Sequence, residues 1–150
     1  MRKRGKHTRR VVGKMLTPAD HNRLMILPRM HLNLVLGGAL EGEYLATIAG
    51  VFNIVIALAH IQGKPQRQAF FEKGQSVVFE MIKSRTLPDE VSLSVMLESF
   101  NSADHYIGIQ QTVHIHRALT LVDKTIARGD AVSLNGSKPS IKDGLQSGFA

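Results

Sequence analysis

Residues 43–62 read EYLATIAGVFNIVIALAHIQ, and this stretch decides the fold. It is the most apolar segment of the chain, and it carries no charged residue from Tyr44 to Ala59. A helix that spans a membrane needs about 20 apolar residues, and this run is shorter. It also contains the polar residues Thr47 and Asn53. We therefore expect a central helix of a bundle, buried on most sides, with a membrane segment as the alternative.

Two helices are expected before this segment. Thr17 is suited to cap a helix, and Pro18 is suited to the first helical position. Pro28 is expected to break or kink that helix, because proline lacks the backbone N–H of a helix interior. A second helix is then expected over about residues 28–40, with Gly42 as its stop.

Further helices are predicted after the apolar segment. Residues 65–85 repeat apolar side chains at helical spacing on one side. These are Phe70, Val77, Val78, Met81 and Ile82. The helical pattern continues from Val91 to Ile126, as one helix or as two with a break near Asn101 or Gly108, and Gly129 ends it. The chain is therefore predicted to be all-α, a single-domain bundle of about four to six helices over residues 17–129.

The positive charge of the chain lies at its N-terminus. The net charge is +7, but residues 1–14 contain seven basic residues and no acid. The remaining part of the chain holds twelve basic and twelve acidic residues and is neutral. We therefore divide the chain into a flexible basic arm over residues 1–16, the bundle, and a flexible Ser- and Gly-rich tail over residues 130–150.

The arm is the candidate binding site. Its cations can neutralise the phosphates of DNA or RNA and release counterions. The predicted phosphate contacts are Arg2, Lys3, Arg4, Lys6, Arg9, Arg10 and Lys14. No aromatic residue lies in the arm, so it offers no base stacking. An acidic protein surface or a membrane would attract the same charges, and a solvated tail without a specific role is the remaining interpretation.

No pattern in the sequence predicts catalysis, a metal site or a cofactor. His114 and His116 are two residues apart, so on a helix they point to nearly opposite faces. His21, His60 and His105 could meet in space, but nothing in their spacing requires it. Asp104 and His105 are neighbours without a nucleophile motif, and no phosphate-binding loop is present. The chain is therefore expected not to be an enzyme.

A family resemblance covers residues 20–65. HLNLVLGGALEGEYLATIAGVFNIVIALAHIQG resembles small helical proteins encoded by phages, plasmids and mobile elements of proteobacteria. The residues that carry the resemblance are His31, Leu32, Leu34, Leu36, Leu45, Asn53, Ile54 and Val55. Some such proteins carry a Fis-like regulator label, but this chain departs from that pattern because no basic recognition helix stands at its C-terminus. The resemblance implies a mobile-element origin more than an activity.

The sequence thus predicts a cytoplasmic, non-catalytic accessory protein that binds the nucleic-acid backbone through its arm. The alternative is a helical inhibitor or adaptor that binds a host protein or ribonucleoprotein, as an anti-CRISPR-like protein would. A second alternative is a small membrane-associated protein that uses residues 44–59, and a membrane is the least favoured partner. The apolar stripe from Leu93 to Ile126 also allows a homodimer.

Overall fold

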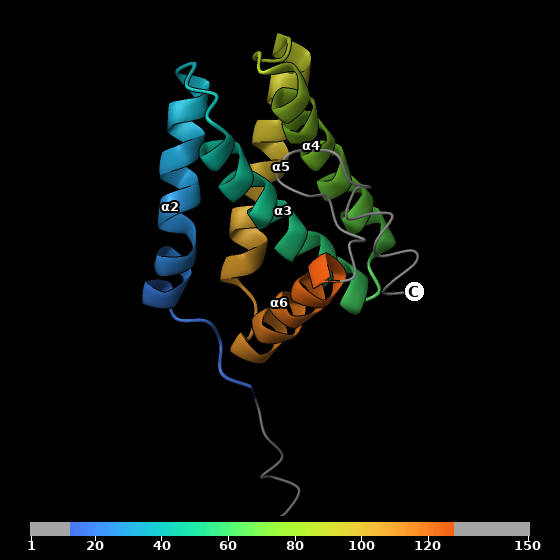
Figure 1. Ribbon diagram of the computed structural model, residues 1–150. Coiled ribbons are helices and arrows are strands. Elements are labelled where there is room, and N and C mark those ends of the chain that lie inside the picture. The colour runs from blue at the N-terminus through green and yellow to red at the C-terminus, as the bar shows by residue number, and fades with distance from the viewer. Residues whose placement is uncertain (1–12, 128–150) are drawn as a thin grey trace, which may run out of the picture.

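Five helices account for most of the part of the chain, residues 13–127, that the computed structural model describes (Figure 1). They are α2 (Pro18–Leu36), α3 (Gly42–Ile61), α4 (Pro65–Ser84), α5 (Glu90–Gly108) and α6 (Thr112–Ala127). The central helix α3 packs against each of the other four. No strand occurs within residues 13–127, and the predicted all-α bundle is confirmed.

The enclosure of α3 explains its unbroken apolar run. The side chains from Val55 to Ala59 are fully buried, although five consecutive residues cover every side of a helix. The polar residues Asn53 and Thr47 have partners on neighbouring helices. Asn53 Oδ1 accepts a hydrogen bond of 2.7 Å from Gln75 Nε2, and Thr47 Oγ1 lies 2.6 Å from His31 Nδ1. Side chains from α4 and α2 therefore satisfy the polar groups that burial would otherwise leave unpaired.

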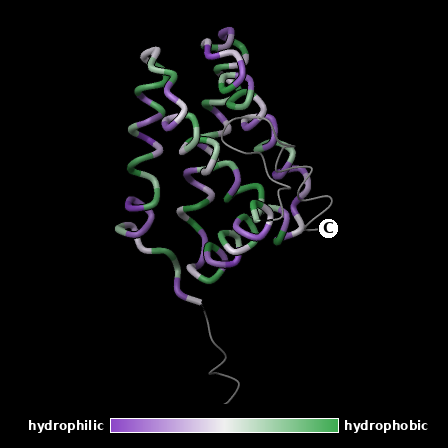
Figure 2. Tube along the Cα trace, in the orientation of Figure 1, coloured by the Kyte–Doolittle hydropathy of each residue, from purple (hydrophilic) through white to green (hydrophobic). Residues whose placement is uncertain are grey.

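Within the described part of the chain, α3 alone is long and apolar enough to cross a membrane, and 56% of its most apolar window is buried. A core helix meets the same length and composition test. The hydrophobic turns of α3 lie among the other helices at the centre of the bundle (Figure 2). This packing favours the core helix over the membrane segment.

The expected break at Pro28 is wrong. Helix α2 runs without interruption from Pro18 to Leu36 and contains Pro28 in its interior. The proline removes one backbone hydrogen bond, and the buried apolar residues on both sides of it pack on α3 and keep the two halves together. The helix ends before Gly38, whose φ of 102° favours glycine. The expected stop at Gly42 is also wrong, because Gly42 begins α3.

The long helical pattern after Val91 divides into two helices at Gly108. The linker between them is paired with residues 14–16, which the sequence had placed in the arm. Leu16 N donates to the Gln110 carbonyl over 2.9 Å, and Thr112 N donates to the Lys14 carbonyl over 2.8 Å. These two hydrogen bonds place the start of the described chain beside the α5–α6 linker.

The predicted apolar side of α4 is buried at Val78, Met81 and Ile82, but its first turns face the core differently. Phe71 is buried, whereas Phe70 is only partly buried and lies at the edge of the core. One turn further along, a Cβ atom on Gly74 would lie 2.5 Å from the Ser99 Cβ atom and 2.9 Å from the Phe52 ring. The absence of a side chain at Gly74 therefore allows α4 to pack closely against both α5 and α3.

Candidate nucleic-acid interface

The charges of the bundle balance in number, but five of its ten cations gather at one end. Residues 13–127 contain ten basic and ten acidic residues. One group of five cations lies where α3 ends and α4 begins, together with the start of the described chain and α6 (Figure 1). We call this group the cationic end, and it consists of Lys14, Lys64, Arg67, Arg117 and Lys124. All five are exposed, and none forms a salt bridge within residues 13–127.

The opposite end of the bundle carries four acids at two helix starts, together with the cations Lys83 and Arg85 at the end of α4. Glu41 and Glu43 lie at the start of α3, and Asp89 and Glu90 lie at the start of α5. Arg85 Nη1 donates to the Leu40 carbonyl over 3.1 Å, which joins the loops that carry these two helix starts. A helix of this length spans about 30 Å, so the two ends of α3 present opposite charge across the whole bundle.

The arm joins the bundle at the cationic end. Of the seven predicted phosphate contacts, only Lys14 lies within the described residues, where it is exposed and its carbonyl is bonded to Thr112 N. The other six, at positions 2, 3, 4, 6, 9 and 10, lie outside residues 13–127. The chain continues from Gly13 toward these residues, so six further cations are attached beside the cationic end.

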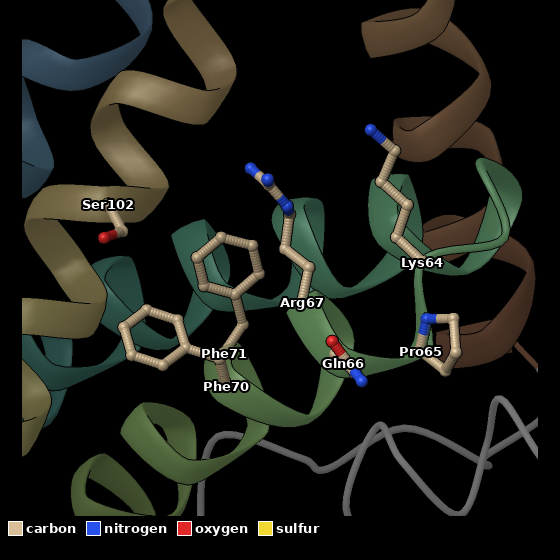
Figure 3. A pocket seen from close by; sticks show the side chains of 7 residues that line it. All are labelled: Lys64, Pro65, Gln66, Arg67, Phe70, Phe71 and Ser102. Carbon is tan, nitrogen blue, oxygen red and sulfur yellow. The ribbon is translucent and has the colours of Figure 1, made fainter.

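Two pockets meet at Lys64 and Arg67. The first has a volume of about 660 Å³ and is shown in Figure 3. It is lined by Lys64, Pro65, Gln66, Arg67, Phe70, Phe71 and Ser102. The second has a volume of about 440 Å³ and extends to Met15, near the end of the arm that joins the bundle. The two cations therefore stand between a pocket with aromatic walls and the point where the arm begins.

The Arg67 guanidinium is held in place by an aromatic ring and a polar network beneath it. Its Cζ atom lies 4.7 Å from the centre of the Tyr106 ring, a cation–π contact. The Tyr106 hydroxyl donates to Gln62 Oε1, and Gln62 Nε2 donates to Gln110 Oε1 over 2.7 Å. Gln110 Nε2 closes the network by donating to the Tyr106 carbonyl over 2.9 Å. The Tyr106 hydroxyl is protonated at neutral pH even at its ordinary pKa of 10.0, and burial raises that pKa further.

Asp104 serves a structural contact between helices and is not paired with its neighbour His105. Its carboxylate accepts two hydrogen bonds from Arg29, of 2.7 and 2.8 Å, and one of 2.7 Å from His21 Nε2. Arg29 and His21 belong to α2, so the cluster joins α2 to α5. A Cβ atom on Gly108 would lie 2.7 Å from the His21 ring, so this glycine leaves room for the imidazole.

The contacts of Asp104 predict how the stability of the fold depends on pH. Burial of the Asp104 carboxyl tends to raise its pKa, but the hydrogen bonds from Arg29 and His21 outweigh burial and hold the pKa below its ordinary value of 3.8. The folded protein then binds fewer protons than the unfolded chain in this range, so stability falls as the pH drops through and below 3.8. We expect Asp104→Asn to lower the free energy of unfolding at pH 7 by about 2 kcal/mol and to flatten this acid dependence.

Urea denaturation between acid and neutral pH measures this effect. The matched control is Asp123→Asn, because Asp123 is an exposed acid with no salt bridge among the described residues. Equal stability of the two variants at pH 7 would contradict the assigned role of Asp104.

The histidines do not assemble a recognisable metal site within the described chain. The sequence suggested that His21, His60 and His105 could meet in space. In the structure, His21 forms a hydrogen bond with Asp104. Among residues 13–127 there is no group of three or more His, Asp or Glu side chains that could hold a metal ion.

No protein-family model, curated protein or solved structure matches this chain. We therefore argue function from the geometry of the side chains.

The sequence did not identify four of the five members of the cationic end. Lys64, Arg67, Arg117 and Lys124 are spread over about 60 residues and are diluted by acids in any count along the chain. A signal for two of them was present in the order of the elements. One predicted helix ends at about residue 62 and the next begins at 65, so Lys64 and Arg67 had to lie at one shared end. Folding is required to bring Lys14 and α6 to the same place.

Proposed function

We propose that this protein is a non-catalytic accessory protein, of the kind carried by phages and mobile elements, that binds nucleic acid. The arm and the cationic end together form the binding surface. The observation that carries the proposal is the attachment of the arm at the end of the bundle where five exposed cations gather. A cationic surface of this kind binds the phosphate backbone by charge neutralisation and counterion release.

The positions of the acidic residues support a binding surface formed by the arm and the cationic end. An acidic surface would repel a polyanion, and the acids at the starts of α3 and α5 lie at the far end from the arm. A strand that contacts the arm is therefore guided toward Lys64 and Arg67 and away from the opposite end. Contacts of this type position a backbone and read little sequence.

Binding of the full chain to a mixed pool of labelled DNA and RNA, followed by fluorescence anisotropy, tests the proposal. Titrations at about 50 and 200 mM salt should show affinity that falls steeply with salt. Absence of salt-sensitive binding to every nucleic acid in the pool would refute the proposed function.

The alternative role in binding a protein is favoured by one other observation. Helix α2 exposes four large apolar side chains on its outer surface, which we call the α2 face. They are Ile26, Leu27, Met30 and Leu34. Leu27 also lines an apolar pocket of about 520 Å³ that extends to Ile126 on α6. Large apolar side chains exposed together on one helix face suit contact with another protein, either a host protein or a second copy.

We expect the α2 face to mediate a homodimer. In a two-fold pair the same face of both copies is covered, so one substitution removes two contacts. Sedimentation velocity of the full chain should show a dimer at micromolar concentration, and Met30→Glu should sediment as a monomer. Glu98→Gln, an exposed position on α5, serves as the control and should leave the dimer intact. A wild-type monomer would contradict self-association through this face.

A further inference from the structure

We propose that the pocket lined by Phe70, Arg67 and Lys64 takes an unpaired nucleobase, so that the bundle binds single-stranded nucleic acid. The inference rests on the proposed function and names the form of nucleic acid that the site recognises. It assigns to the bundle the stacking surface that the arm lacks, since no aromatic residue occurs in the first fourteen positions.

The walls of the pocket supply aromatic surface at the edge of the core. Phe70 is partly buried and lines the pocket, and it packs on the buried Phe71 with ring centres 5.7 Å apart. Phe71 in turn packs on Tyr106 with ring centres 5.6 Å apart. The pocket volume of about 660 Å³ lies within the range of small-molecule sites and accommodates a planar base. Phe70 is thus an aromatic side chain that is held by the core and still reaches the pocket.

The same pocket carries positive charge at its rim. Arg67 projects from the start of α4 beside the phenylalanine rings, and Lys64 projects in a similar direction on the far side of Arg67 (Figure 3). Arg67 lies over the Tyr106 ring, and this cation–π contact favours a position of its guanidinium at the pocket rim. A base in the pocket would have its flanking phosphates within reach of these two cations. Stacking surface combined with cations along the backbone is the arrangement that binds single strands.

A second pocket extends this surface beyond the two cations. It shares Lys64 and Arg67 with the first pocket and reaches Met15 and Gln111. A strand with one base beside Phe70 would therefore pass both cations as it leaves the first pocket.

Stacking in this pocket distinguishes single strands from duplexes. In a duplex the faces of each base are covered by its neighbours, and only the ends or unpaired positions are open. A single strand can place any base against an aromatic ring, because every base has a π-face. The pocket therefore contributes to affinity for single strands and contributes nothing to affinity for an intact duplex.

The chain contains no tryptophan, which provides a direct test. Phe70→Trp would place a single indole in the pocket, and its fluorescence should be quenched when a (dT)12 strand binds. A blunt-ended duplex without a loop should bind without quenching. Phe79→Trp is the matched control, because Phe79 is also a partly buried residue of α4 but lines the apolar pocket on another side. Its fluorescence should not respond to either ligand.

Affinity gives an independent measurement. Phe70→Leu keeps apolar volume and removes the ring, and it should weaken binding of (dT)12 about tenfold while leaving duplex binding unchanged. Phe79→Leu should change neither affinity. Circular dichroism melting of each variant shows that the fold is retained.

The outcomes separate this inference from the function on which it rests. If the wild type binds neither ligand, the proposed function itself fails. If it binds both in a salt-sensitive manner, but Phe70→Trp is not quenched and Phe70→Leu binds (dT)12 like the wild type, the stacking site is refuted and the proposed function stands. Selective quenching together with selective loss of single-strand affinity supports the stacking site.

Discussion

Gly74→Ala is expected to lower the free energy of unfolding by about 2 kcal/mol, although alanine is the better helix former. The added methyl group would lie 2.5 Å from the Ser99 Cβ atom and 2.9 Å from the Phe52 ring. A Cβ atom cannot rotate away from such a contact, so α4 must move away from α5 and α3. Ser99 is fully buried and donates to the Phe70 carbonyl over 3.2 Å, and this movement would weaken that bond too.

Gly50→Ala is the matched control, because Gly50 is also a helix-interior glycine but has no atom within 4 Å of an added Cβ. It should raise stability by up to about 1 kcal/mol, which is the ordinary preference of a helix for alanine. Chemical denaturation of both variants gives the two values. If both substitutions changed the free energy of unfolding in the same direction, the close contact at Gly74 would not control the packing of α4.

The fold class could be predicted from the sequence because the decisive feature is local. The apolar run over residues 43–62 has no charge to expose, and helices with one apolar side flank it, so a bundle around it follows. The break at Pro28 could not be judged in the same way. Local propensity predicts a break there, and packing of both halves of α2 on α3 reverses it. The energy that decides the position comes from contacts distant in sequence.

The candidate site likewise combines features that are local in sequence with contacts between distant residues. The arm is evident as a run of charge, but the neutral balance of the rest of the chain hides the cationic end. Phe70 and Phe71 are adjacent, and both line the pocket, but only the packing of α4 determines that Phe71 is buried in the core while Phe70 stays partly exposed. Asp104 likewise has a sequence neighbour, His105, that suggests a pair, and its actual partners lie more than 70 residues away on α2. Contacts between helices therefore supply what the sequence pattern lacks.

Removal of the arm's charge is expected to have the largest effect on binding. In this variant Gln replaces Arg2, Lys3, Arg4, Lys6, Arg9 and Arg10. If each cation meets one phosphate of a single strand, the slope of log affinity against log salt becomes less steep by about 4, and affinity near 0.1 M salt falls by roughly ten-thousandfold. Replacing the exposed Lys64, Arg67, Arg117 and Lys124 with Gln in the full-length chain should reduce the slope by about 3.

The two sets of substitutions distinguish a shared surface from an independent tail. Because the arm begins beside the cationic end, one strand should contact both, and each variant should retain the part of the salt dependence that the other loses. The control replaces Lys73 and Lys83 with Gln, which are exposed cations of α4 outside the cationic end, and the slope should stay unchanged. Anisotropy titrations over a salt series measure all four proteins. If the arm variant alone changes the slope, the bundle does not touch the strand, and the arm acts as a tail whose position on the fold is irrelevant to binding.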